Sequence, residues 1–221
     1  MLPAGAATYS LVNDWSDTTN PNGVWSYLRA GAPFPATVAN WSQFGTAWAD
    51  SATPGFGFAP SLFKYDGPGT GNQSIDALAG DIVGHTQTND ANAGAGELAV
   101  RFTAPFAGLA TISGSVWDAH TSVIRRQQWN VWVNGQSSSS GVVLGDGTNG
   151  RNARDTFLLS GLQLEQGALV ELRLSRYIDN GGLLGMTFDV DLTPTSVVPV
   201  PASLPLFMAG IGGLLIGLRR R

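Results

Sequence analysis

Leu169-Val170-Glu171-Leu172-Arg173-Leu174-Ser175-Arg176 is the stretch that decides the fold. Val170, Leu172 and Leu174 alternate with polar or charged residues. Successive side chains of a β-strand point to opposite faces of the sheet, so this spacing predicts a strand with one buried and one solvent-exposed face. The same alternation recurs at residues 98–102, 129–133 and 186–192.

Turn-forming residues separate the predicted strands. Asn134-Gly135 is the strongest hairpin signal in the chain. The residues Asn20-Pro21-Asn22-Gly23 form another turn signal, because Asn and Gly accept positive φ and Pro presets its own φ. About nine short strands with turns between them predict an all-β fold, a sandwich or a barrel. No helical period competes with this pattern before residue 202. The serine run at residues 137–140 is predicted to be a solvated loop.

Composition narrows the function classes. Only 13% of the 221 residues are charged and 29 are glycine, which suits an all-β fold with many loops. With 43% hydrophobic residues the chain can bury a core, so disorder is not expected. The absence of cysteine excludes disulfides and thiol chemistry. The net charge of −4 argues against nucleic acid as a partner.

The C-terminal end has the composition of a membrane segment. An uncharged run extends from Ala202 to Leu218, and Arg219, Arg220 and Arg221 follow it. As an α-helix this run would rise roughly 25 Å, near the short end of what spans a bilayer. The three arginines would lie on the cytoplasmic side, leaving residues 1–201 outside. The alternative is a buried core helix, but such helices are normally amphipathic.

Residues 198–221 also resemble a known sorting signal. Val198-Pro199-Val200-Pro201-Ala202, the apolar run and the arginine cluster are similar to the PEP-CTERM signal, in the variant that reads V-P-L-P-A. This chain has Val200 where the variant has Leu. The resemblance implies recognition by an exosortase, a membrane-embedded cysteine protease of Gram-negative bacteria. It also implies a passage from the inner membrane, with the domain outside, to the cell surface or the extracellular space.

These features divide the chain into four parts. Residues 1–7 are interpreted as the end of a signal peptide that begins upstream of Met1, because Ala4-Gly5-Ala6 fits the small-residue cleavage pattern. The alternative is an ordinary N-terminus. Residues 8–192 form the β domain, residues 193–198 a linker, and residues 199–221 the sorting signal.

The body of the chain carries a second resemblance. Residues 20–27 (NPNGVWSY), His85, residues 100–105 (VRFTAP) and residues 131–135 (VWVNG) are similar, in this order, to a β-sandwich domain common among PEP-CTERM proteins. That domain looks like the jelly-roll scaffold of carbohydrate-binding modules. The resemblance therefore implies a jelly-roll-like β-sandwich, and a shared scaffold does not define a shared ligand.

Two histidines are the most reactive candidates. Asp118 and His120 lie two residues apart, on one face of an extended chain. With His85 brought near, they would form a metal site or an acid/base pair; the alternative is a loop end bonded to backbone and water. Residues 146–150 and 179–182 offer oxygen donors for Ca²⁺, although they also read as plain turns. No other cofactor is expected.

Aromatic residues are the other candidates. The chain contains seven tryptophans, and such rings stack on the apolar faces of sugars. Trp25, Tyr27 and Trp132 fall on strand faces opposite their aliphatic neighbours, so they are the candidates for exposed ligand-binding residues; the alternative for each tryptophan is a place in the core. The remaining aromatic residues are expected in the core. No nucleophile elbow, phosphate loop or zinc spacing occurs, so no catalytic residue is assigned.

Three functions fit these observations. The first is a non-catalytic protein that is exported, anchored in the membrane, processed by an exosortase and associated with exopolysaccharide or biofilm. The second is a carbohydrate-binding module with a defined site of exposed aromatic residues. The third is a hydrolase or lyase, which would need a cleft with two carboxylates or with His85, Asp118 and His120.

Overall fold

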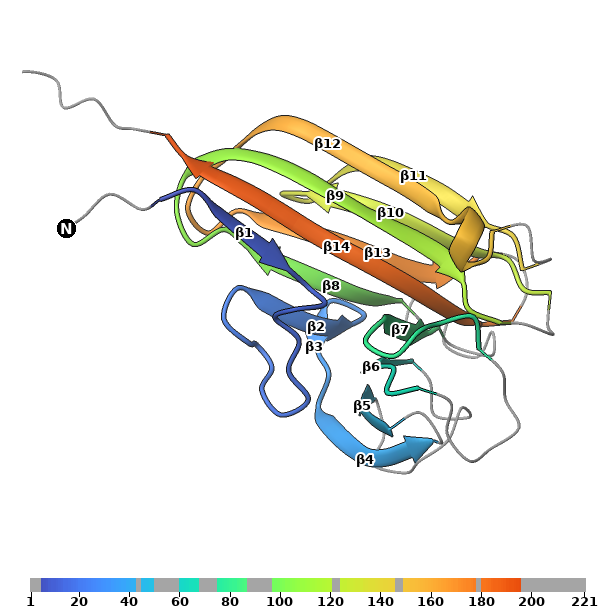
Figure 1. The fold of residues 1–221 in the computed structure, drawn as a ribbon. Coiled ribbons are helices and arrows are strands. Elements are labelled where there is room, and N and C mark those ends of the chain that lie inside the picture. Colours follow the sequence, from blue (N-terminus) through green and yellow to red (C-terminus); the bar gives the residue numbers. More distant parts are fainter. Residues whose placement is uncertain are drawn as a thin grey trace, which may run out of the picture.

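Two antiparallel β-sheets pack face to face in a sandwich, as the ribbon shows (Figure 1). The sandwich confirms the predicted all-β class. Fourteen strands and one short 3₁₀ helix, η3 (Arg151–Ala153), lie in the described residues. Of residues 36 and 38–42 the backbone alone is described. The computed structural model describes residues 5–42, 45–49, 60–67, 75–86, 97–120, 124–145, 149–177 and 180–195.

The larger sheet has the order β12-β9-β14-β7-β6-β5-β4, with β1 also paired to β14. The long strand β14 pairs with β9 along one edge, and its other edge is shared between β7 and β1. The strands of the larger sheet are β1 (Ala7–Ser10), β4 (Ala36–Ser42), β5 (Gly45–Ala49), β6 (Ser61–Lys64), β7 (Ile82–His85), β9 (Gly108–Asp118), β12 (Asp155–Leu164) and β14 (Leu183–Pro194).

The smaller sheet has the order β11-β10-β13-β8-β2-β3. The hairpin predicted at Asn134-Gly135 joins β10 and β11, and both residues have the positive φ that such a tight turn requires (49° and 79°). The serine run at residues 137–140, predicted to be a loop, instead lies within β11 and pairs with β10. The strands of the smaller sheet are β2 (Trp25–Arg29), β3 (Ala32–Pro33), β8 (Leu98–Thr103), β10 (Gln127–Val133), β11 (Gln136–Val143) and β13 (Leu169–Arg176).

The main core lies between the sheets and follows the predicted alternation. Val170, Leu172 and Leu174 of β13 are fully buried in it, as are Phe188 and Val190 of β14. Removing this apolar surface from water, at roughly 25 cal/mol per Å², is the dominant stabilising term.

A second hydrophobic cluster covers the outer face of the larger sheet. Val83 and Leu183 belong to it, whereas their neighbours Ile82 and Leu184 belong to the main core. Adjacent residues of a strand face opposite ways, so β7 and this end of β14 are buried on both faces. The segment around Asp76 lies over the cluster, where its carbonyl accepts a hydrogen bond from Trp117 Nε1 at 2.7 Å.

The predicted membrane helix lies outside the described residues. Across the part of the chain that the structure describes, no helix is long and apolar enough to cross a membrane. Residues 196–221, which include the predicted sorting motif, the apolar run and the arginine cluster, also lie outside the described residues. The strand β14 extends to Pro194, so it includes the first two residues of the predicted linker.

Candidate functional site

Trp25 and Tyr27 are core residues, and the prediction that they are exposed is wrong. Both are 0% exposed. The Trp25 ring packs edge-on against Phe102 and Phe188, at 5.5 and 5.4 Å between ring centroids. Leu28, on the opposite face, is also buried, so the aliphatic spacing of this strand does not identify its inner face.

Tyr27 is fixed by polar contacts as well as by packing. Its hydroxyl accepts a hydrogen bond from the Ser16 backbone N–H at 3.0 Å, and its ring lies 4.3 Å from that of Trp15. Burial raises the pKa of Tyr27 to about 12, with a smaller contribution from the charges of Asp17 and Asp14, while the hydrogen bond from Ser16 opposes the shift. The side chain is therefore neutral and structural.

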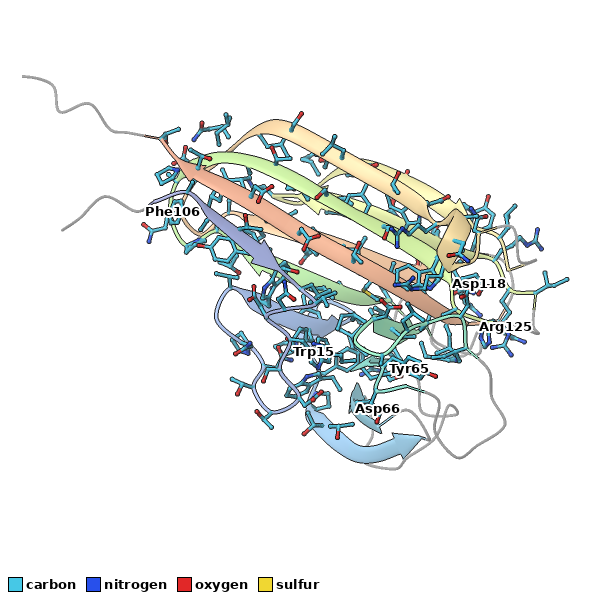
Figure 2. All side chains as sticks on the ribbon, viewed as in Figure 1. Trp15, Tyr65, Asp66, Phe106, Asp118 and Arg125 are labelled. Atoms are coloured by element: carbon cyan, nitrogen blue, oxygen red, sulfur yellow. The ribbon has the colours of Figure 1, made fainter. Side chains whose placement is uncertain are left out.

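His85 and His120 do come together, at one end of the sandwich. Their ring centroids are 6.3 Å apart and their rings are nearly perpendicular. Asp118 Oδ1 accepts a hydrogen bond from the backbone N–H of His120 at 3.1 Å. Figure 2 shows Asp118 and Arg125 at this end, far from Phe106 at the other. The juxtaposition considered from the sequence is thus present in the fold.

Burial controls the chemistry of this histidine pair. Burial, then the neighbouring His120 and Arg125, lower the pKa of His85 to about 3, although a hydrogen bond involving the Thr86 backbone opposes the shift. Burial, then Arg125, lower the pKa of His120 to about 4. Both rings are therefore neutral at neutral pH. Among the described residues no group of three or more His, Cys, Asp or Glu side chains could hold a metal ion.

The same end of the sandwich is closed by a buried hydrogen-bond network. Thr86 Oγ1 donates to Gln127 Oε1 at 2.5 Å and accepts from the Gly182 N–H at 3.0 Å. Gln127 Nε2 donates to the Asn180 carbonyl at 3.0 Å. Since Thr86 follows β7 and Gln127 begins β10, this network ties the two sheets together. The candidate calcium segments, residues 146–150 and 179–182, lie partly outside the described residues, at 146–148 and at 179.

Trp132 lies on the outer face of the smaller sheet. Its ring is half-buried, and the guanidinium carbon of Arg173 lies 4.4 Å from the ring centroid. Strand pairing places Trp132 opposite Glu171 of β13 and Ser137 of β11. A cation over an indole face is an attractive, orienting contact. Trp132 is thus the sequence-predicted aromatic that does reach the surface.

A charge network fixes the surroundings of Trp132. The Glu171 carboxylate pairs with Arg101 at 2.6 Å and with Arg173, and Arg173 also lies 3.9 Å from Glu97. Burial raises the pKa of Glu171, but hydrogen bonds and charges from Arg173 and Arg101 outweigh it and hold that pKa below its usual range. Glu171 therefore stays ionised and holds both guanidinium groups in place.

The strand register turns these side chains into one surface. Residues directly opposite each other in antiparallel strands share a face of the sheet. A row therefore crosses four strands through Trp132, Glu171, Arg101 and Ser26, and Asn130 and Arg173 form the row beside it. We refer to these six residues as the Trp132 face. It combines one aromatic ring with amide, hydroxyl and guanidinium donors, which suits a flat, hydroxyl-rich ligand.

Sequence reasoning missed most of this face. The alternation in β13 does put Glu171 and Arg173 on the outward side, and Arg101 alternates in the same way in β8. What it does not provide is the register that brings residues 70 positions apart, Arg101 and Glu171, into contact. That signal lies in the strand pairing and not in any local motif.

Comparison with known proteins gives similarities of fold only. No protein-family model and no curated protein sequence matches the chain. The CBM22-1 xylan-binding domain of Xyn10C from Paenibacillus barcinonensis is similar at 11% identity, covering 88% of this chain and 100% of that chain, with a TM-score of 0.39. The CBM35 of Abf62 from Cellvibrio japonicus is similar at 15% identity, covering 62% and 90%, with a TM-score of 0.33.

A family 35 carbohydrate-binding module from Clostridium thermocellum is similar at 16% identity, covering 58% of this chain and 90% of that chain, with a TM-score of 0.32. All three structural similarities have low TM-scores. The fold class of this protein is therefore taken from its own strand pairing. In the part that the structure describes, the chain is an all-β sandwich built from two antiparallel sheets.

Proposed function

We propose that the chain is a non-catalytic extracellular domain that binds polysaccharide through the Trp132 face. The observation that carries the proposal is the half-buried Trp132 ring held against Arg173, beside an ionised and nearly buried Glu171. An indole stacks on the apolar face of a sugar ring, while guanidinium and amide groups donate hydrogen bonds to its hydroxyls. Because Glu171 fixes the arginines in advance, little side-chain entropy is lost on binding.

The charges on this face favour a neutral polysaccharide. Arg101 and Arg173 are balanced by Glu171 and Glu97, so the ion network carries no net charge. The buried Glu171 already serves two arginines, and its side chain is 7% exposed. A carboxylate held ionised in this way is a poor general acid. A glycosidase needs a protonated carboxyl group as its general acid, beside a second carboxylate.

Replacing Trp132 with alanine is expected to weaken binding to soluble xylan and β-glucan at least tenfold, because the stacking surface is lost. Affinity electrophoresis of the wild type and variant in gels containing either polysaccharide, or neither, measures the change. Leu158→Ala is the matched control, since Leu158 is a 69% exposed apolar residue of β12 in the other sheet. Equal retardation of the wild type and Trp132→Ala would contradict the assignment.

Measuring the chain length of the polysaccharide after incubation tests the proposal that the protein is not catalytic. The wild type is expected to leave xylan and β-glucan unshortened after prolonged incubation. Glu97 is the carboxylate to watch, because burial raises its pKa even though Arg173 opposes the shift. Shortening that Glu97→Gln abolishes would identify a hydrolase and overturn this part of the proposal.

The proposal includes a route to the cell surface. Residues 198–202, the apolar run and the terminal arginines would anchor the chain in the inner membrane until an exosortase removes the tail. This rests on the sequence pattern: a proline-containing motif, an uncharged segment of bilayer length and a positively charged end.

Replacing Pro199 and Pro201 together with alanine is expected to leave the full-length chain in the membrane fraction of an exosortase-containing Gram-negative host. The wild type is expected in the medium or on the cell surface with its C-terminal segment removed. Intact-mass analysis of each fraction measures the difference, with Pro194→Ala, at the end of β14, as the control. Full-length wild type in the cytosol would contradict the route.

A further inference from the structure

A separate pocket of about 320 Å³ opens between the two sheets, beside β1 and the start of β2. Its size is at the lower end of small-ligand sites, enough for about one sugar ring. Tyr9 contributes from the larger sheet and Trp25 from the smaller one, so the pocket lies at the edge of the sandwich. It is lined by Tyr9, Asp14, Asn22, Gly23, Val24 and Trp25.

The wall of the pocket is held by hydrogen bonds. Asn22 and Trp25 exchange backbone hydrogen bonds of 2.8 and 3.0 Å across the turn, and Gly23 between them has a φ of +58°. Asn22 Nδ2 donates to the Asp14 carbonyl at 2.7 Å. Because that bond uses the amide nitrogen, Asn22 Oδ1 remains as an acceptor.

The Asp14 carboxylate is satisfied on one oxygen only. Oδ2 accepts from the Ser10 N–H at 3.0 Å and from Trp25 Nε1 at 3.1 Å. Oδ1 accepts no hydrogen bond from a described residue, and none of the ion pairs within the described ranges includes Asp14. A half-buried negative charge therefore faces this pocket, and no cation of the described residues forms an ion pair with it.

An aromatic ring lies beside this charge. Tyr9 lines the pocket, and its ring packs against Phe102 with 5.2 Å between ring centroids. A cation is attracted both to a carboxylate and to aromatic faces. An ammonium group carries three donors and no acceptor, which matches the open oxygens of Asp14 and Asn22. Calcium fits less well, since it takes 6–8 oxygen ligands, usually from several carboxylates.

We propose that this pocket binds a small polar ligand that carries a protonated amine, of the chemical class of an amino sugar. Asp14 Oδ1 receives the ammonium group, Asn22 Oδ1 receives a further donor, and the Tyr9 side chain packs against the ligand. The site shares no residue with the Trp132 face, so it does not depend on the function proposed for that face.

Glucosamine, glucose and N-acetylglucosamine distinguish the charge from the sugar ring. In isothermal titration of the intact chain at neutral pH, glucosamine is expected to bind at least tenfold more tightly than the other two, which lack the positive charge. Equal affinities for the three sugars, or no heat from glucosamine, would overturn the proposal. So would displacement of glucosamine by an equal concentration of calcium chloride, which would identify a metal site.

Asp14→Asn removes the charge and keeps the shape. Its amide oxygen can still accept from Ser10 and Trp25, and the melting temperature reports whether the fold survives. Glucosamine binding is expected to weaken at least tenfold in this variant and to stay unchanged in Trp132→Ala. Unchanged binding in Asp14→Asn would contradict the proposal. Loss of glucosamine binding in Trp132→Ala would place glucosamine on the Trp132 face instead. The proposals for the two sites can therefore be contradicted independently.

Discussion

Replacing Trp25 with alanine is expected to lower the free energy of unfolding by about 3–5 kcal/mol, the cost of removing a large aromatic side chain from a packed core. Trp25 is fully buried and packs against Phe102 and Phe188, which come from different sheets. The substitution also removes the Nε1 donor that binds Asp14. Because domains of this size are stable by only about 5–15 kcal/mol, this single change approaches the whole margin.

Urea unfolding followed by intrinsic fluorescence measures this loss, and Trp132→Ala is the matched control. Trp132 is half-buried on the outer face, and its contact with Arg173 contributes about 1 kcal/mol or less. Trp132→Ala is therefore expected to change polysaccharide binding with little effect on stability, and Trp25→Ala the reverse. A Trp25 variant as stable as the wild type would place this residue outside the core.

The strands were predictable where one face of a sheet meets the core and the other meets solvent. In β13 and in the part of β14 beyond Leu184, hydrophobic residues alternate with polar ones, and the inner set is the one that is buried. The hairpin at Asn134-Gly135 was predictable for a local reason, since the turn itself demands positive φ.

Alternation fails where the larger sheet is covered on both sides. Ile82, Val83, Gly84 and His85 form β7, and all four are buried, because the second hydrophobic cluster packs against the outer face. A short stretch of this kind has no period to detect. The same difficulty affects β2, where Trp25, Tyr27 and Leu28 are all buried and the aliphatic residues do not mark the inner side.

The sites depend on contacts between distant parts of the chain. Arg101 and Glu171 meet only because β8 pairs with β13, and Tyr9 reaches the pocket only because β1 pairs with β14. Pairing between strands that are far apart in the chain leaves no local sequence signature. Neither the ion network around Glu171 nor the pocket beside Asp14 can therefore be predicted from motifs. Alternation alone could indicate only which side chains of a strand face outward, such as the half-buried Trp132 and its neighbours Glu171 and Arg173.

The histidine pair makes the stability of the fold sensitive to mild acid. In the unfolded chain both histidines have a pKa of about 6.5. In the folded chain burial lowers the pKa of His85 to about 3, with His120 and Arg125 adding to the shift and a Thr86 backbone hydrogen bond opposing it. Burial and Arg125 lower the pKa of His120 to about 4. Between about pH 6.5 and these values, the unfolded chain binds protons that the folded chain does not.

Lowering the pH from about 6.5 to about 4.5 is therefore expected to destabilise the wild type, by up to about 1.4 kcal/mol per pH unit for each histidine. In this window the double variant His85→Gln, His120→Gln is expected to lose little stability, because neither glutamine takes up a proton. Urea unfolding at half-unit pH steps measures both profiles. The slope is the readout, since replacing a buried ring also changes the absolute stability.

The carboxylates are the same in the wild type and the double variant and serve as the internal comparison. Arg173 and Arg101 hold the pKa of Glu171 below its usual range in spite of its burial, so the stability that Glu171 contributes is present above its unfolded pKa and is lost only at lower pH. The slopes of the wild type and the double variant are thus expected to differ from about pH 6.5 down to the folded pKa values of about 4 and 3, and to become parallel only below them. Parallel profiles across the whole range would mean that the histidines take up protons in the folded chain, and that the end of the sandwich closed by Thr86 and Gln127 admits charge.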